Sequence, residues 1–192
     1  MIYIMKTKNM VMCGLFAAIL CCCAAITIVL PFTAIPITFQ VLAVSVAGAV
    51  MGKKYGALSV IIYTLIGFCG LPVFSGMKGG VTALAGPTGG FIIGFIPEAF
   101  VTGLIVELIV KKEDKILVKN IKIFFAMIVG LVVLYAFGTV QFMFMAKISV
   151  LKALTLAVIP FVPLDVAKIV VAVVVSIFVK NNIYGTSINE AS

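Results

Sequence analysis

The sequence predicts an all-α integral membrane protein, and three observations support that fold class. Of the 192 residues, 64% are hydrophobic and only 10% are charged, and the mean hydropathy is +1.36. A soluble domain of this length does not have enough interior to bury so much apolar side chain. The apolar residues also gather in runs, several of them as long as a bilayer crossing. The length fits one domain, residues 1–192.

The apolar runs divide into six candidate transmembrane helices, with five or seven as the alternatives. The first is expected to stay as a helix, because it is as long as a bilayer crossing and has no Ala-x-Ala type cleavage site. The second and third are short and are joined by the turn GKKYG at residues 52–56. The expected helices cover residues 10–30, 37–51, 55–71, 90–110, 120–144 and 160–180.

The lysines orient these helices. The net charge of +8 comes from lysine alone, since the sequence has no arginine. If the N-terminus lies inside, ten lysines fall in inner segments and three in outer ones, and Lys168 lies within the last helix. This distribution obeys the positive-inside rule, so we expect a multi-pass plasma-membrane protein with both termini in the cytoplasm and no nucleic-acid partner. The inner lysines are at 6, 8, 53, 54, 111, 112, 115, 119, 122 and 180, and the outer ones are Lys78, Lys147 and Lys152.

The five cysteines do not predict a metal site. Three of them are consecutive, at positions 21–23, and so point in directions about 100° apart on a helix. The sequence has no histidine and no Cys-x-x-Cys pair. We therefore expect neither a metal nor a cofactor, and interpret the cysteines as small apolar residues in a reducing cell.

Residues 70–90, GLPVFSGMKGGVTALAGPTGG, contain seven glycines and two prolines. Irregular backbone is not tolerated facing lipid, because each unpaired polar group there costs several kcal/mol. Since the stretch is still rich in apolar residues, we expect an outer loop between the third and fourth helices that folds back into the bundle as a cap. The amides at its GPTGG end suit a carboxylate. An ordinary helix connection is the alternative interpretation.

The last expected helix carries an ionisable pair, Asp165 and Lys168, which share one helical face. Pro163 suits the first turn of that helix, where a carboxylate interacts favourably with the helix dipole. A well-formed helix start with a self-neutralising pair is therefore one interpretation. A functional site is the other, because an ionisable group in hydrocarbon costs roughly 2.5 to 3.5 kcal/mol on insertion scales.

Other polar residues in apolar segments are weaker candidates. Glu98 follows Pro97 within the fourth helix and is a candidate to line a cavity. Glu107 is expected to pair with Lys111, one helical turn further on. Three uncharged residues are placed to hydrogen-bond either a ligand or another helix: Gln40, Tyr135 and Gln141.

The first expected helix carries small residues at a spacing of four, which permits close approach of another helix. The spacing leaves open whether that helix belongs to this chain or to another subunit. One set is Gly14, Ala18 and Cys22, and the other is Ala17, Cys21 and Ala25.

Several separate motifs, in this order, resemble the BioY family, the biotin-specific substrate-binding (S) components of energy-coupling factor (ECF) transporters. They are IPITFQVLAVSVAGAVMGKKYG (35–56), YTLIGFCGLPVFSG (63–76), GPTGGFIIGF (86–95) and PFVPLDVAK (160–168). The resemblance implies a six-helix membrane fold with a high-affinity biotin pocket near the outer face. It also implies partners, namely a transmembrane coupling subunit and two ATPase subunits. This chain lacks the motif G-x-x-x-x-G-K-[ST], so it is not the ATPase.

The resemblance implies which part of biotin each candidate residue would contact. Asp165 is a candidate to accept a hydrogen bond from a ureido N–H, and Lys168 is a candidate either to donate to the ureido oxygen or to neutralise the carboxylate. The candidates for the carboxylate tail are Lys78, Gly79, Gly80, Thr88, Gly89 and Gly90, and those for the apolar walls are Phe32, Phe74 and Phe91. Family members often have tyrosine at the position of Phe91. The small-residue face of the first helix resembles the alanine-rich surface that docks on the coupling subunit, although cysteine here replaces some of the alanine.

Three other functions compete with biotin uptake. An S component for another vitamin, such as thiamine or riboflavin, would share the fold, and the absence of tryptophan disfavours a large aromatic ligand. An intramembrane enzyme would have to use Asp165 and Glu98, but the sequence lacks a paired carboxylate motif and a metal cluster. A channel or structural bundle would use the glycines only for packing.

Overall fold

A computed structural model describes residues 2–29, 31, 35–111 and 113–184, with only the backbone described for residues 2–6, 183 and 184. Five helices in this part of the chain are long and apolar enough to cross a membrane. They are α1 (Ile2–Ala25), α2 (Gln40–Phe68), α4 (Gly89–Ile109), α5 (Ile116–Ala146) and α7 (Val162–Tyr184). Two short helices, α3 (Val81–Leu84) and α6 (Val150–Ala157), and an antiparallel pair of strands, β1 (Thr27–Ile28) and β2 (Ile37–Thr38), complete the fold.

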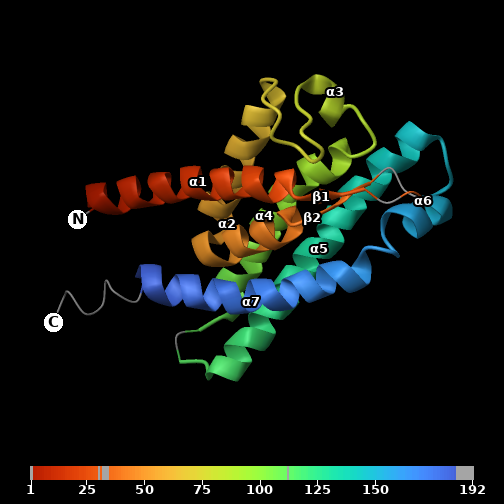
Figure 1. The fold of residues 1–192 in the computed structure, drawn as a ribbon. Coiled ribbons are helices and arrows are strands. Elements are labelled where there is room, and N and C mark those ends of the chain that lie inside the picture. The colour runs from red at the N-terminus through yellow and green to blue at the C-terminus, as the bar shows by residue number, and fades with distance from the viewer. Residues whose placement is uncertain (1, 30, 32–34, 112, 185–192) are drawn as a thin grey trace.

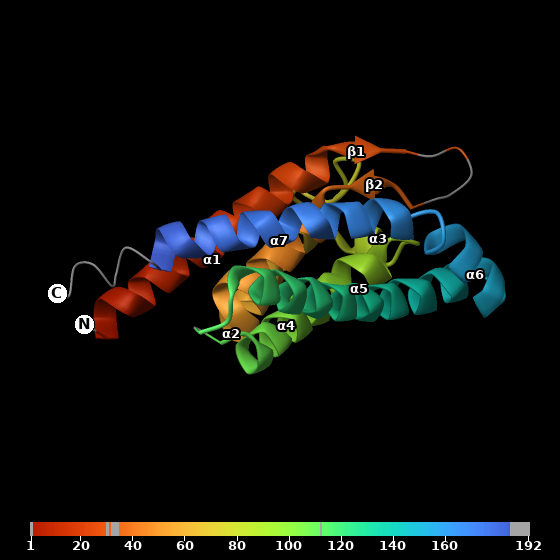
Figure 2. The same ribbon diagram turned by 90° about the horizontal axis from the view of Figure 1, so that it is seen from below.

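The long helices form one bundle in which α4 packs between α2 and α5 (Figure 1). Helix α1 packs against α2, and α7 packs against both α2 and α5. The strands, α3 and α6 gather at one end of the bundle, here called the cap end, as Figure 2 also shows. The start of α1 and the end of α7 lie at the opposite end, here called the termini end.

Helix α2 is broken at Gly52, within the turn that the sequence predicts. The backbone of Gly52 has φ 76° and ψ 178°, a conformation that only glycine adopts readily. After the break, Gly56 comes close to the backbone of Ala47 and Gly48, so the two halves of α2 approach each other closely. The predicted helices at 37–51 and 55–71 are therefore one element with a kink. With five long helices described, a sixth crossing stays a prediction.

The Gly/Pro-rich segment packs against the end of α2. Phe74 and Lys78 exchange two backbone hydrogen bonds, of 2.9 and 3.3 Å, which close a tight turn. The ring of Phe74 lies directly over Gly67, where any Cβ atom would overlap it. The same ring meets Tyr63 edge to face at 5.6 Å. The aromatic side chains thus hold the segment on the bundle.

Side chains of two other elements also hold this segment. Gln141 of α5 donates through its Nε2 to the carbonyl oxygens of Leu84 and Gly86, at 2.6 and 2.9 Å. The backbone N–H of Gly76 donates to Thr27 Oγ1 of β1 at 3.2 Å. The segment, here called the cap (residues 70–88), is therefore attached to α2, α5 and the strand pair.

Candidate functional site

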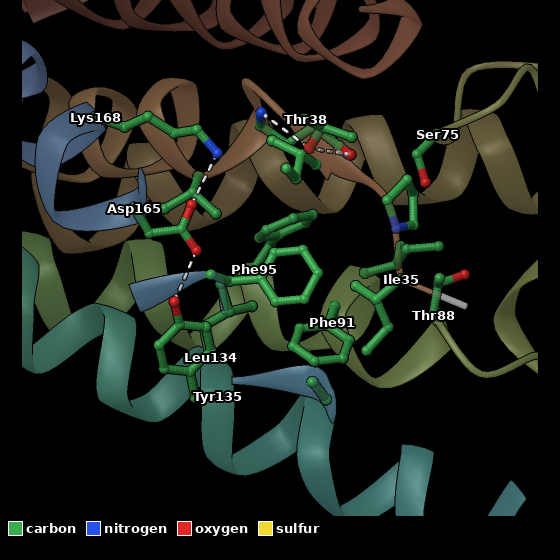
Figure 3. A pocket seen from close by; sticks show the side chains of 17 residues that line it. Ile35, Thr38, Ser75, Thr88, Phe91, Phe95, Leu134, Tyr135, Asp165 and Lys168 are labelled. Atoms are coloured by element: carbon green, nitrogen blue, oxygen red, sulfur yellow. Dashed lines mark hydrogen bonds and ion pairs between the residues drawn. The ribbon is translucent and has the colours of Figure 1, made fainter. Parts of the chain in front are cut away.

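A pocket lies at the cap end, between β2 and helices α2, α4, α5 and α7 (Figure 3). Its lining is mostly apolar, with a few polar groups, as in most small-molecule sites. Among the described residues that line it, Asp165 and Lys168 are the charged ones. The cavity has a volume of about 50 Å³, well below the roughly 300 to 1,000 Å³ of typical ligand pockets.

The carboxylate of Asp165 is held from two sides. Lys168 Nζ donates to Asp165 Oδ1 at 2.8 Å, and the hydroxyl of Tyr135 donates to Oδ2 at 2.7 Å. The side chains of Asp165 and Lys168 are only 6% and 11% exposed. A buried charge requires a partner and hydrogen bonds, and this arrangement supplies both. Each oxygen still has free lone-pair capacity, and Lys168 has two more N–H groups to donate.

The start of α7 fixes the position of this pair. The backbone N–H of Asp165 donates to the Phe161 carbonyl at 2.8 Å, in the first turn of the helix. The positive end of the helix dipole there favours a carboxylate. Lys168 follows one turn later on the same face, as its spacing predicts.

Aromatic side chains form the apolar side of the pocket. Phe91 and Phe95 are one turn apart on α4, and Phe161 precedes α7. The ring of Phe91 lies against Gly138 of α5, where a Cβ atom would overlap it. The close approach of α4 and α5 at this glycine thus allows the ring to reach the pocket.

A chain of hydrogen bonds connects the pocket to the cap. Thr38 Oγ1 donates to Gln40 Oε1 at 3.1 Å, and Gln40 Nε2 donates to the Tyr63 hydroxyl at 2.6 Å. Tyr63 in turn donates to the carbonyl oxygen of Val73 in the cap at 3.2 Å. Because each of these side chains already has partners, Gln40 is held in a single orientation at the pocket wall.

The structure brings together six of the residues predicted for the site: Asp165, Lys168, Gln40, Tyr135, Thr88 and Phe91. A second hollow, of about 340 Å³, adjoins the pocket at Thr88 and is lined by Lys78 and Gly79. Phe74, Gly80, Gly89 and Gly90 line neither cavity, and Phe32 lies outside the described residues.

Some residues of the pocket are absent from the sequence prediction: Thr38, Ser75, Phe95 and Phe161. Phe95 and Phe161 lie four residues from Phe91 and Asp165, so helical spacing was a usable signal for both. Thr38 and Ser75 lie in a short strand and in the cap, where the sequence has no periodicity to follow.

Three other polar residues singled out in the sequence have structural partners. Glu98 is fully buried between α2 and α4 and accepts a hydrogen bond from Ser45 Oγ at 3.0 Å, without lining the pocket. Gln141 binds the cap, as described above. Glu107 pairs with Lys53 of α2 rather than with Lys111, because the Gly52 break brings Lys53 against α4.

The small residues of α1 divide between two environments. Gly14, Ala18 and Cys22 are exposed, and no atom lies within 4 Å of a Cβ position built on Gly14. Of the other set, Ala17 is buried and Cys21 is partly buried, while Ala25 is exposed. The first set thus leaves a flat face open to lipid or to another protein.

Comparison with known proteins yields one family. The model of the BioY family matches residues 1–184. A biotin transporter BioY from Rhizobium etli is 43% identical, and the alignment covers 88% of this chain and 90% of that protein. A biotin transporter BioY from Thermotoga maritima is 38% identical, with 90% and 96% covered.

The fold also has a counterpart among solved structures. It is similar to the crystal structure of an S-component for biotin from an ECF-type ABC transporter, with a TM-score of 0.80. The two chains are 24% identical, and the match covers 90% of each. At this identity the likeness concerns the fold.

Proposed function

The chain belongs to the BioY family, and we propose that it captures biotin and takes part in its uptake as the substrate-binding component of an ECF-type transporter. It is a transport protein and not an enzyme. The observation that carries this proposal is the Asp165–Lys168–Tyr135 cluster, a hydrogen-bonded charge pair in the wall of an otherwise apolar pocket.

This cluster matches the ureido ring of biotin, which has two N–H donors and one carbonyl acceptor. The oxygens of Asp165 and Tyr135 accept from the ureido N–H groups, and Lys168 donates to the ureido oxygen. The rings of Phe91, Phe95 and Phe161 cover the apolar bicycle. The ureido ring and the cluster thus satisfy each other's hydrogen bonds in a site from which water is largely excluded.

The carboxylate tail requires a separate cation, because Asp165 and Lys168 neutralise each other. Lys78 lies in the adjoining hollow, and Thr88 lines both cavities. We therefore place the tail along Thr88, with its carboxylate near Lys78. Biotin methyl ester, which lacks the charge, should bind wild type several-fold more weakly than biotin, and this difference should vanish in Lys78→Ala. If wild type and Lys78→Ala preferred biotin over its methyl ester equally, the carboxylate would have to bind at a place other than Lys78.

The cap has to move for biotin to enter. A cavity of about 50 Å³ is too small for a ligand that fills a pocket of several hundred Å³. We place the opening at the cap, which side-chain hydrogen bonds and the contacts of Phe74 attach to α2, α5 and β1.

The membrane topology is part of the proposal. We place the N- and C-termini in the cytoplasm, six crossings with the two halves of α2 as separate ones, and the cap facing outward. The lysine distribution supports this orientation, and the kink at Gly52 supports the division of α2. In a variant whose five native cysteines are replaced by serine, a membrane-impermeant thiol reagent should label Ser75→Cys from outside intact cells. Labelling only after the membrane is permeabilised would reverse the orientation.

The proposed partners are a transmembrane coupling subunit and two ATPase subunits. The exposed face of Gly14, Ala18 and Cys22 suits close packing with a helix of the coupling subunit. Introduction of a bulky residue, as in Ala18→Trp, should abolish co-purification of the coupling subunit from the native membrane while biotin binding persists. Co-purification of the variant at the wild-type level would contradict this assignment.

Direct binding of radiolabelled biotin to the detergent-purified protein tests the function. Binding at nanomolar to low-micromolar concentrations supports the proposal, and absence of binding at micromolar ligand overturns it. Thiamine and riboflavin, tested as competitors, separate biotin from other vitamins. Mass spectrometry of the recovered ligand should return unchanged biotin, as expected for a protein without chemistry on its substrate.

A further inference from the structure

A third cavity, a hollow with a charged lining, lies at the termini end, remote from the proposed biotin pocket. It has a volume of about 480 Å³, and four helices form its walls. Asn9 of α1, the broken part of α2, Glu107 near the end of α4 and Lys180 of α7 line it. Figures 1 and 2 show the ends of α1 and α7 on this side of the bundle. None of its residues takes part in the proposed biotin site.

The hollow carries a net positive charge. Its lining contains Lys53, Lys54 and Lys180 against a single acid, Glu107. Glu107 is engaged by Lys53, whose Nζ lies 3.3 Å from Oε2 and whose backbone N–H donates to Oε1 at 3.0 Å. Lys54 and Lys180 form no ion pair with any described residue. Lys180 also lies within electrostatic range of Glu107, which attracts it, and of Lys119 of α5, which repels it less strongly.

The surroundings of these lysines are apolar. Ala49, Val50, Met51 and Val106 form the apolar part of the lining, and Asn9, Gly52 and Tyr55 complete it. Lys54 and Leu58 are both exposed and share one face of α2, being four residues apart. Leu108 of α4, next to Glu107, is 70% exposed. A cationic hollow with exposed leucines near its lining residues along the same helices is complementary to a molecule that is anionic at one end and apolar along the other.

We infer that this hollow binds the phosphate of an anionic phospholipid, with Lys54 and Lys180 as its cationic contacts and the acyl chains along Leu58 and Leu108. Lysine donates to phosphate as a compact point charge. Basic hollows between membrane helices on the cytoplasmic side are suited to anionic headgroups, and the topology proposed above places this end there. Only the orientation of this end depends on the proposed function. The charges and the lining of the hollow do not, and lipid binding is a property separate from biotin capture.

Native mass spectrometry of the full chain, titrated with phosphatidylglycerol or phosphatidylcholine, tests the inference. We expect wild type to prefer phosphatidylglycerol. Each lysine near an anionic surface contributes about fivefold in affinity, so Lys54→Gln/Lys180→Gln should weaken phosphatidylglycerol binding roughly 25-fold. Binding of phosphatidylcholine and the Kd for biotin should not change. The matched control, Lys147→Gln/Lys152→Gln at the cap end, should retain the preference for phosphatidylglycerol.

Four results would overturn the inference. They are equal binding of the two lipids, unchanged phosphatidylglycerol affinity in Lys54→Gln/Lys180→Gln, an equal loss in the cap-end control, and displacement of the lipid by millimolar inorganic phosphate. The last would assign the hollow to a free anion. Loss of a co-purifying protein with lipid binding intact would assign it to a protein partner instead. Should the double variant not fold, the exposed Lys54→Gln alone should show about a fivefold loss.

Discussion

The two ends of the bundle each hold a lysine–carboxylate pair, and burial separates their roles. At the cap end the side chains of Asp165 and Lys168 are 6% and 11% exposed, and Tyr135 donates a further hydrogen bond. At the termini end the side chains of Lys53 and Glu107 are 39% and 42% exposed. Breaking a buried pair leaves an uncompensated charge and costs about 3 to 5 kcal/mol. An exposed pair contributes about 0 to 1 kcal/mol. The same residue types thus form the proposed ligand site at one end and a weak contact at the other.

The largest effect is expected from Asp165→Asn, which leaves the charge of Lys168 unpaired. We expect the affinity for biotin to fall at least 30-fold, since truncating one partner of a buried pair costs about 2 to 5 kcal/mol. The protein should still insert, and Lys168→Ala should weaken binding as well. Equilibrium binding of radiolabelled biotin measures the change, with Glu107→Gln as the matched carboxylate control. Unchanged affinity in both Asp165→Asn and Lys168→Ala would remove the pair from the site.

Tyr135→Phe should have the next largest effect, because it removes the hydroxyl oxygen that is proposed to accept from a ureido N–H, together with the hydrogen bond to Asp165 Oδ2 at 2.7 Å. A ureido N–H left unpaired in the pocket costs about 1 to 3 kcal/mol, so biotin affinity should fall roughly five- to 150-fold. Tyr55→Phe, in the hollow at the other end, is the control and should bind as wild type. Equal affinities of the two variants would mean that the hydroxyl only supports the fold.

A smaller effect is expected from loosening the cap. Gln141→Leu removes two hydrogen bonds to the carbonyl oxygens of Leu84 and Gly86. Each bond contributes about 1 kcal/mol, so labelled biotin should dissociate roughly five to thirty times faster in a dilution experiment. Asn182→Leu, at the far end of α7, is a polar-to-apolar control. A wild-type dissociation rate in Gln141→Leu would exclude the cap as the gate of the pocket.

Some features of the fold and of the candidate site were predictable from the sequence, and others were not. The long helices were predictable because hydropathy is a local signal. Asp165 and Lys168 were predictable because ionisable residues are scarce in apolar segments. Phe95 is one of 15 phenylalanines, so scarcity did not mark it, and its spacing of four from Phe91 was its one signal. The two strands have two residues each and α6 has eight, so they are too short for a hydropathy period to mark them.

The ion-pair partner of Glu107 could not be predicted from local sequence rules either. The i,i+4 rule favoured Lys111, since a local rule considers only neighbours on one helix. The break at Gly52 instead places Lys53 against α4, with its N–H 3.0 Å from Glu107 Oε1. The glycine was visible in the sequence as part of a turn, but the direction in which the chain left that turn was not.

Stability measurements should find only a small effect at the termini end. Glu107→Gln keeps an oxygen for the Lys53 N–H and removes only the charge, so it should lower the free energy of unfolding by less than about 1 kcal/mol. Glu107→Ala also removes the side-chain oxygen that accepts from the Lys53 N–H, where α2 resumes after Gly52, and should cost about 1 kcal/mol more. Thermal unfolding in detergent at two salt concentrations measures both. A larger loss in Glu107→Gln than in Asp165→Asn would reverse the comparison drawn above.

The smallest effect is expected at Asp114, which lies between α4 and α5, outside the membrane-spanning segments. Its Oδ2 accepts from Lys122 Nζ at 2.7 Å and from the Lys111 N–H at 2.8 Å. The hydrogen bond from Lys122, more than any other cause, holds the pKa of Asp114 below its ordinary value. The stabilisation is therefore present above that ordinary pKa and is lost as the pH falls through the lowered one. Asp114→Asn should unfold at a slightly lower temperature than wild type at neutral pH, and the difference should disappear in acid. A difference that persists or grows below the lowered pKa would show that the side chain acts through packing and not through its charge.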